Sequence, residues 1–231
     1  MIGRIFEMFV SVQGEGILAG EQMLFVRFSG CNLNCDYCDT EECRHAISGR
    51  LLTHEEIIRE IEDMLAQNPS VGTVSFTGGE PLLQSELIAE LTQYLKEKKI
   101  KIYVDTNGTL CDKFANIASN VDCVAMDIKL PSASGGMEFW EEHKKFLLSA
   151  CENIFVKIVL TSKTTVDEFK KAVEMVERVN NLIPFVMQPV TPIKKVDGIL
   201  PENLERFKKI AEKRLKKVSI IPQMHKKWGI K

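Results

Sequence analysis

The sequence predicts a single α/β domain built as a partial, open (β/α)6 barrel. Segments typical of strands alternate with segments typical of helices almost throughout residues 1–231. Such alternation implies a parallel sheet with right-handed crossovers, and nearly continuous apolar strands imply burial on both faces of the sheet. About six β/α units are too few to close an eightfold barrel, so we expect the sheet to remain open.

The predicted strands are mostly apolar and lie between the predicted helices. They span residues 2–9, 23–28, 73–77, 100–105, 121–128, 154–160, 184–188 and 218–221. Glycines and polar residues follow most of them directly, as in the cysteine-rich run 30–40 and in residues 77–81, 105–108, 127–129, 188–189 and 222–225. Active sites of barrels of this kind lie at the C-terminal ends of the strands, so we expect the site at this rim.

The first helix has a clear start signal. Thr53 can act as the N-cap, and Glu56 follows three residues later, which together make a capping box. Apolar residues at helical spacing carry this helix to about Gln67. Pro201 is well suited to begin the last long helix. The other predicted helices span 82–98, 112–118, 137–149, 166–179 and 201–215.

Composition and charge exclude several classes of protein. The chain has 30 Lys and Arg against 32 Asp and Glu, so no basic excess recommends nucleic acid as a partner. The N-terminus lacks the apolar stretch of a signal peptide, and no apolar run is long enough to span a bilayer. Seven cysteines without an export signal point to a reducing compartment. We therefore expect a cytoplasmic protein without membrane or nucleic-acid partners.

Three cysteines in one short loop are the most informative motif. Cys31, Cys35 and Cys38 follow a strand with the spacing C-x3-C-x2-C. Iron–sulfur clusters are held by cysteine thiolates, normally four. Three thiolates can hold three corners of a 4Fe–4S cluster and leave one iron open, where S-adenosylmethionine can bind and be cleaved reductively. The motif therefore indicates a radical enzyme.

Other uses of these cysteines stay open at this point. Cys43 or His45 is a conceivable fourth ligand, which would make a zinc knot and, at the level of function, a zinc-bound interaction module. Zinc knots need cysteine pairs from two separate stretches of chain, and only one group is visible. A redox dithiol through Cys35 and Cys38 leaves Cys31 unexplained.

A second motif follows the next predicted strand along the chain. Gly78 and Gly79 allow the backbone to approach a ligand closely, and Pro81 can begin a helix after Glu80. Alone, this turn is most often a tight strand-to-helix loop. One strand–helix unit after the cysteine loop, it indicates a site for S-adenosylmethionine, whose amine Glu80 and the backbone near Gly79 would hold.

These motifs resemble the radical S-adenosylmethionine superfamily. Within it, the runs 11–16, 25–31, 38–40 and 222–225 are similar to the 7-carboxy-7-deazaguanine synthase family. The resemblance implies ring contraction of 6-carboxytetrahydropterin to 7-carboxy-7-deazaguanine with loss of ammonia, in the biosynthesis of queuosine and other 7-deazapurines. It implies no side-chain acid–base catalyst, because the reactive species comes from S-adenosylmethionine.

The resemblance also assigns roles to residues. Thr40 would bind Mg²⁺, which takes few protein ligands and keeps water or substrate oxygens. The residues implied at the cofactor are Tyr37, Cys38, Asp39, Gly78, Gly79, Glu80, Asp127, Lys129 and Gln188. The residues implied at the substrate are Val12, Gln13, Gly14, Glu15, Arg27, Thr77 and His225. Gln13 and Glu15 would read the pyrimidine edge of the pterin, and the planar fork of Arg27 suits its carboxylate.

Several of these residues also have a purely structural interpretation. Residues 13–16 are compatible with a simple turn, and Asp127 with Lys129 is compatible with a structural ion pair. Arg27 lies in an otherwise apolar strand, where an unpaired charge is costly.

The resemblance further implies a flavodoxin or ferredoxin as electron donor and a homodimer. It makes residues 1–22 and 218–231 extensions on the substrate side of the domain. The enzyme alternative is a glycyl-radical-enzyme activase, which would share the cysteines but would have no use for Gln13, Glu15 and Thr40 as a pterin and magnesium site.

Overall fold

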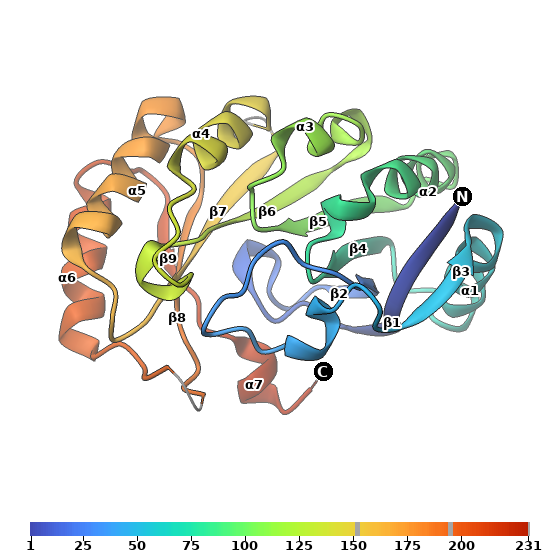
Figure 1. The fold of residues 1–231 in the computed structure, drawn as a ribbon, viewed down its shortest axis with the longest axis horizontal. Helices are drawn as coiled ribbons and strands as arrows, with labels where there is room; N and C mark the ends of the chain where they lie inside the picture. The colour runs from blue at the N-terminus through green and yellow to red at the C-terminus, as the bar shows by residue number, and fades with distance from the viewer. Residues whose placement is uncertain (151–152, 194–195, 231) are drawn as a thin grey trace.

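One twisted sheet organises the molecule (Figure 1). The computed structural model describes residues 1–150, 153–193 and 196–230. Its sheet has the strand order β3-β1-β2-β4-β5-β6-β7-β8-β9. The strands are β1 (Ile2–Val12), β2 (Gln22–Phe28), β3 (Arg50–Thr53), β4 (Thr73–Gly78), β5 (Lys101–Thr106), β6 (Cys123–Ile128), β7 (Ile154–Leu160), β8 (Phe185–Pro189) and β9 (Val218–Ile220).

The sheet is parallel from β2 to β9, whereas β1 pairs antiparallel with both β2 and β3. The described sheet begins at β3 and ends at β9 without closing, as an open partial barrel requires. The prediction of a parallel, open α/β fold is therefore confirmed.

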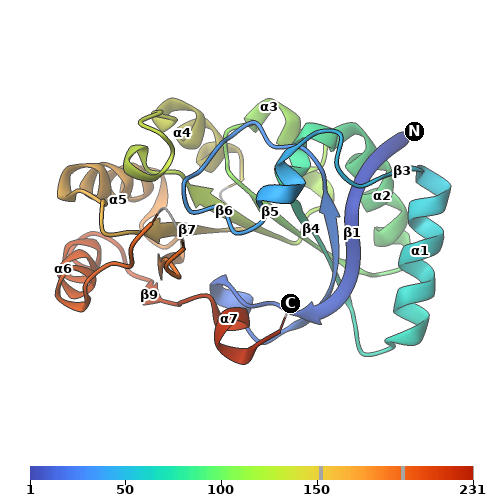
Figure 2. The same ribbon diagram turned by 60° about the horizontal axis from the view of Figure 1, so that its bottom comes forward.

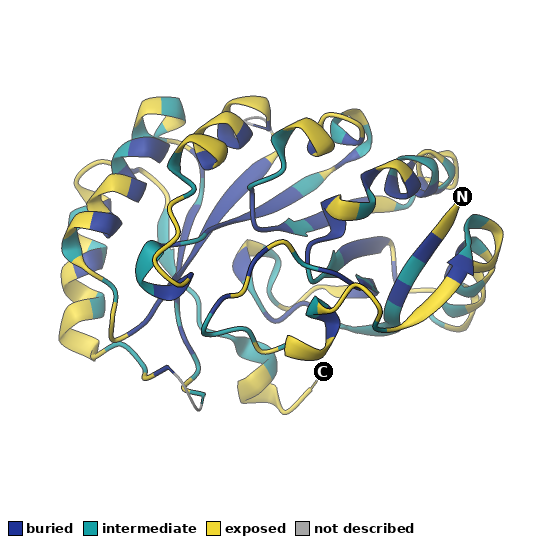
Figure 3. Cartoon of the chain, viewed as in Figure 1, coloured by how far each residue is buried: buried dark blue, intermediate teal, exposed yellow. Residues whose placement is uncertain are grey.

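Helices α1 to α6 cover the convex side of this sheet (Figures 1 and 2). They are α1 (His54–Gln67), α2 (Ser85–Glu97), α3 (Cys111–Phe114), α4 (Trp140–Ser149), α5 (Val166–Asn180) and α6 (Pro201–Glu212). The short helix α7 (Met224–Trp228) lies apart from them, in the tail beside the segment that follows β1. The capping box at the start of α1 is present, with Thr53 accepting from the backbone of Glu56. Their apolar faces pack on the strands, while their outer faces are exposed (Figure 3). No described helix is long and apolar enough to cross a membrane.

Strand alternation divides the buried side chains between two faces. In β7, Val156, Ile158 and Leu160 belong to the large core beneath the helices. Phe155 belongs instead to a smaller cluster on the concave face. By the same alternation Lys157 lies on the concave face, where the site is built.

Four local features differ clearly from the predicted elements. β3 was not predicted, because four residues carry little periodic signal; it pairs with β1 and forms one edge of the sheet. α7 was not predicted either, although the run 222–225 was singled out. The helix expected at 112–118 is only Cys111–Phe114, and the one expected from Met137 begins at Trp140, after Gly135 and Gly136 with positive φ.

Candidate active site

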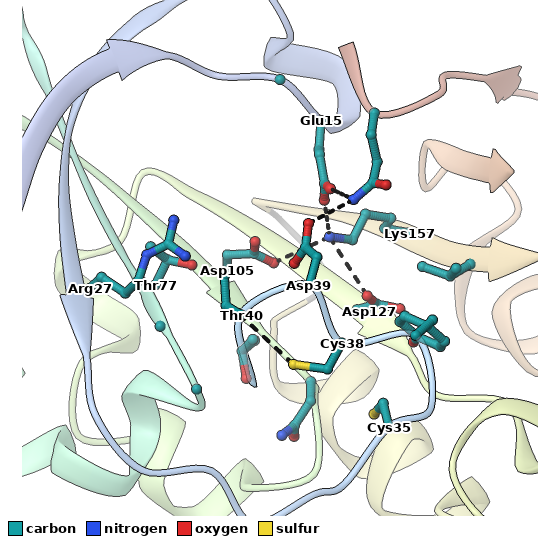
Figure 4. A pocket seen from close by; sticks show the side chains of 18 of the residues that line it. Glu15, Arg27, Cys35, Cys38, Asp39, Thr40, Thr77, Asp105, Asp127 and Lys157 are labelled. Atoms are coloured by element: carbon teal, nitrogen blue, oxygen red, sulfur yellow. Dashed lines mark hydrogen bonds and ion pairs between the residues drawn. The ribbon is translucent and has the colours of Figure 1, made fainter. Parts of the chain in front are cut away.

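A pocket opens on the concave face at the C-terminal strand ends (Figure 4). It brings together the cysteine loop, the residues after β1, the ends of β4 to β8, and the tail. Of the predicted site residues, all but Glu80 line it: Val12, Gln13, Gly14, Glu15, Arg27, Cys31, Cys35, Tyr37, Cys38, Asp39, Thr40, Thr77, Gly78, Gly79, Asp127, Lys129, Gln188 and His225.

The three thiols of the predicted cluster face this pocket. Cys35 is buried, Cys31 and Cys38 are partly buried, and none of them forms a disulfide. Burial raises the pKa of Cys31 to about 11 and also raises the pKa of Cys35. Cys43 does not line the pocket: it is fully buried and its thiol donates to the carbonyl of Thr40 at 3.1 Å. The structure thus favours three cysteines at the pocket over four.

The thiols fit a cluster better than a single ion. Within the described part of the chain, no three His, Cys, Asp or Glu side chains converge closely enough to hold one metal ion. In an iron–sulfur cubane each thiolate binds a different iron, so its ligands need not converge on a point. Three separate thiols around one pocket suit that donor set.

The turn after β4 is shaped by close contact with the end of β2. A Cβ on Gly78 would lie 2.2 Å from the carbonyl oxygen of Phe28, and one on Gly79 would lie 2.1 Å from that of Gly30. The backbone N–H of Glu80 donates to the same Gly30 carbonyl at 2.8 Å. These contacts fix the turn directly beside Cys31.

Glu80 points away from the pocket into a nest of neutral donors. Its carboxylate accepts from the hydroxyl of Thr106 at 2.8 Å and from the backbone N–H groups of Asn107 at 2.8 Å and Leu82 at 3.2 Å. The side chain is 0 % exposed, and burial raises the pKa of Glu80 to about 7 despite these bonds. Its predicted contact with an amine stays a prediction; in the structure it joins the β4 and β5 loops.

A buried lysine, Lys157, lies among three carboxylates in another part of the pocket. The ammonium of Lys157 lies 2.6 Å from a carboxylate oxygen of Glu15, 3.7 Å from Asp105 and 3.6 Å from Asp127. Burial is the largest single influence and would raise the pKa of Glu15, but the Lys157 charge and the hydrogen bonds from Lys157 and Gln223 together outweigh it and hold that pKa below its ordinary value. Burial opposes the charge of Lys157 too, and the three carboxylates raise the pKa of the ammonium well above its usual range.

A second ion pair lies toward the cysteine loop. Lys129 contacts Asp127 at 2.7 Å and the hydroxyl of Tyr37 at 3.0 Å. The two residues therefore have the geometry of an ion pair, as their structural interpretation requires. Two buried acceptors in the lining of the pocket nevertheless have no hydrogen-bond partner among the described residues: Oδ1 of Asp127 and Oε1 of Gln188. Buried acceptors of this kind are normally satisfied, so they suit hydroxyl or amine donors of a bound ligand.

The tail closes the pocket from the other side. The Gln223 amide donates to Glu15 at 2.9 Å and to Asp39 at 3.2 Å. The backbone N–H of Met224 donates to the carbonyl of Gly14 at 2.8 Å, and a Cβ on Gly14 would lie 2.5 Å from the His225 ring. His225 itself lies 3.8 Å from Asp39.

The remaining predicted residues are placed on the rim. Arg27 pairs with Glu7 at 3.2 Å and lies over the Phe9 ring, so its charge is paired as an apolar strand demands. Gln13 is buried and accepts from the backbone of Glu15 at 3.0 Å. Thr40 precedes a short 3-10 helix but forms no side-chain cap bond.

Among the pocket residues that were not predicted, three contribute to the charged network: Asp105, Lys157 and Gln223. Lys157 had a usable signal, because a single charge in the otherwise apolar run 154–160 must be paired when buried. Asp105 lies near the C-terminal end of its strand, as Asp127 does. Gln223 carried no signal of its own beyond its place in the tail run 222–225.

Comparison with known proteins shows the family to which the chain belongs. The model of the radical SAM superfamily matches residues 25–212. The 7-carboxy-7-deazaguanine synthase of Geobacter sulfurreducens is 36% identical over 96% of each chain. That of Methanothermobacter thermautotrophicus is 34% identical over 98% of this chain and 97% of its own. The crystal structure of QueE from Escherichia coli shares the fold, with a TM-score of 0.65, 19% identity, and coverage of 95% of this chain and 94% of its own. The chain belongs to the radical SAM superfamily and, within it, to the 7-carboxy-7-deazaguanine synthase family.

Proposed function

We propose that the protein is a 7-carboxy-7-deazaguanine synthase, which contracts the ring of 6-carboxytetrahydropterin with loss of ammonia. The observation that carries this proposal is the joining of two half-sites in one pocket. The three thiols and the β4 turn form one half, and Gln13, Glu15 and the tail form the other. Relatives of the same name cover nearly the whole chain, including both halves.

The thiol half suits a 4Fe–4S cluster with bound S-adenosylmethionine. Cys31, Cys35 and Cys38 would hold the cluster, which when bound supplies one-electron cleavage of the cofactor. The turn at Gly78 and Gly79 leaves backbone open to the pocket beside Cys31. The unpartnered oxygens of Asp127 and Gln188 are available for cofactor hydroxyl or amine groups. The protein's own part is to orient both ligands and to exclude water.

The other half suits a pterin. The Glu15 carboxylate is kept ionised by Lys157 and faces the pocket, so it can accept hydrogen bonds from an amino-pyrimidine edge. Arg27 and His225 line the same pocket and would meet the substrate carboxylate and the open side of the ring. We further propose that the protein acts in the cytoplasm as a homodimer and receives electrons from a flavodoxin or ferredoxin.

The cysteine assignment is tested by two matched substitutions. Cys35→Ala removes a pocket thiol and is expected to abolish both cluster binding and product formation, because an iron loses its only protein ligand. Cys43→Ala removes a buried thiol that does not line the pocket and is bonded to the Thr40 carbonyl, so this variant is expected to keep both. Iron and sulfide content and product yield after anaerobic reconstitution check the pair; a cluster that depends on Cys43 would refute the three-thiol site.

Thr40 is the proposed ligand of Mg²⁺. Its hydroxyl faces the pocket, forms no cap bond and lies 3.9 Å from the sulfur of Cys38. Thr40→Val keeps the shape but removes the oxygen, so stimulation of turnover by added Mg²⁺ should fall severalfold. Thr40→Ser is the matched control and should retain it. A Val variant that responds to Mg²⁺ like the unmodified protein would rule out this site.

A further inference from the structure

The Lys157 ammonium is enclosed by carboxylates from three separate parts of the chain. Glu15 comes from the segment after β1, Asp105 from the end of β5, and Asp127 from the end of β6. An ammonium has three N–H donors and no acceptor, so three carboxylates can each take one. The Lys157 side chain is 7% exposed, which leaves little of it for direct contact with a ligand.

The strand register explains why this cation lies where it does. Lys157 is opposite Asp127 in the β6–β7 ladder, so the two side chains lie side by side on the concave face. The neighbours of Lys157 on that face of β7 are apolar: Phe155 on one side and Val159 on the other. An ammonium buried among apolar groups is costly unless it is paired, so the carboxylates are required for it to lie there.

The three contacts of the Lys157 ammonium differ in length, and the shortest identifies its main partner. The contact with Glu15 is 2.6 Å, within hydrogen-bond range, whereas those with Asp105 and Asp127 are about 1 Å longer. Asp127 has its own short contact with Lys129 at 2.7 Å. Among the described residues, Glu15 has no other ion-pair partner within 4.0 Å. Glu15 is therefore the main partner of Lys157.

We propose that Lys157 is a positioning residue for substrate recognition: anchored by Asp105 and Asp127, it holds the Glu15 carboxylate in the orientation that reads the amino-pyrimidine edge of the substrate. This inference rests on the proposed function, because it assigns Glu15 to the pterin. The lysine acts through Glu15, and Glu15 makes the contact with the substrate.

A double-mutant cycle on Lys157 and Glu15 tests this assignment, since residues that act as a unit give non-additive effects. Lys157→Met should raise the KM for 6-carboxytetrahydropterin by about 10- to 100-fold, the usual loss when a hydrogen bond to a charged group is removed. Glu15→Gln should do the same. The double variant should be no worse than Glu15→Gln alone, because Lys157 has nothing left to position.

Further measurements separate positioning from general damage. The rate of S-adenosylmethionine cleavage without substrate, and the KM for that cofactor, should change by less than about threefold in Lys157→Met, since its short contact is with Glu15. Lys157→Arg keeps the charge and should recover part of the KM. Lys171→Met, which removes an exposed lysine 3.5 Å from Glu138, is the matched control and should change neither constant.

The possible results are distinct. Multiplying effects in the double variant, or a Lys157→Met effect on the cofactor instead of the pterin, would overturn this inference alone. An unmodified protein that makes no 7-carboxy-7-deazaguanine would overturn the proposed function and this inference with it. If Lys157→Met does not fold, the cycle is run with Lys157→Gln, which keeps a polar N–H donor but removes the charge, with the same criterion of non-additivity.

Discussion

Glu15 and Glu80 occupy opposite sides of one active region and solve the problem of burial in opposite ways. Glu15, 17% exposed, is held by the Lys157 cation, and its pKa is lowered although burial opposes this. Glu80, 0 % exposed, has only neutral donors, and burial raises its pKa to about 7. A cation keeps a carboxylate charged and available to a ligand; neutral donors hold a carboxyl in place as part of the scaffold.

The comparison also separates two halves of the pocket. In the Glu80 half, neutral groups surround one carboxyl group, and the network continues through Asn107 to Asn32 in the cysteine loop and to the buried His143. Burial lowers the pKa of His143 to about 4, so this imidazole stays neutral at physiological pH. The Glu15 half is a network of full charges. We expect the first to govern stability and the second to govern ligand binding.

The largest expected effect is on the pH dependence of stability through Glu80. A carboxyl whose pKa rises from 4.5 unfolded to about 7 folded binds more protons when folded, so the free energy of unfolding falls as pH rises between those values. The fall is roughly 3 kcal/mol for this group. Glu80→Gln cannot titrate, so its unfolding free energy in urea at pH 4.5 and pH 8 should lack this decrease.

A matched control for that measurement is Glu90→Gln, a partly exposed position on α2. It should leave the pH dependence unchanged. If Glu80→Gln shows the same decrease as the unmodified protein, another group is responsible for it and the description of Glu80 is wrong.

The next effect is on substrate binding through Glu15. Replacing the carboxylate by an amide in Glu15→Gln removes the charged acceptor, which is worth about 10- to 100-fold in the KM for the pterin. Cofactor cleavage without substrate should be spared. Steady-state kinetics under anaerobic conditions check both constants, and a parallel loss of the two would mean that Glu15 serves the whole pocket and not the substrate.

Much of this architecture follows from local sequence patterns. The strand alternation, the capping box at Thr53 and the cysteine loop are short-range signals, and the structure confirms the elements that they predict. The contact between Glu15 and Lys157 joins residues 142 positions apart, and that between Glu15 and Gln223 joins residues 208 apart. Such pairs depend on strand register and on the path of the tail, which a single sequence does not reveal.

Glu80 is a second case in which the sequence predicts a position but not the contacts of the side chain. The motif 78–81 correctly indicated a turn beside Cys31, because the two glycines are needed for close backbone contact. Which way the Glu80 side chain turns depends on donors supplied by Thr106 and Asn107 on the next strand. The motif predicted the position of the turn, and the β5 loop decided the environment of its carboxyl group.

The smallest expected effect concerns the tail. Gln223→Ala removes one neutral donor from Glu15 and one from Asp39, which is worth about 0.5–1.5 kcal/mol for such a bond, or a 2- to 10-fold rise in the KM for the pterin. Lys157 still holds Glu15 in this variant, so the loss should be smaller than in Glu15→Gln. An equal or larger loss would place the main support of Glu15 in the tail and not in Lys157.

The decisive measurement is mass spectrometry of the products after anaerobic incubation of the reduced, cluster-loaded protein with S-adenosylmethionine, Mg²⁺ and 6-carboxytetrahydropterin. We predict 7-carboxy-7-deazaguanine and ammonia, formed only when the thiols of Cys31, Cys35 and Cys38 are all present. Cleavage of S-adenosylmethionine with the pterin left intact, by a protein that carries its full cluster, would contradict the joining of the two half-sites described here.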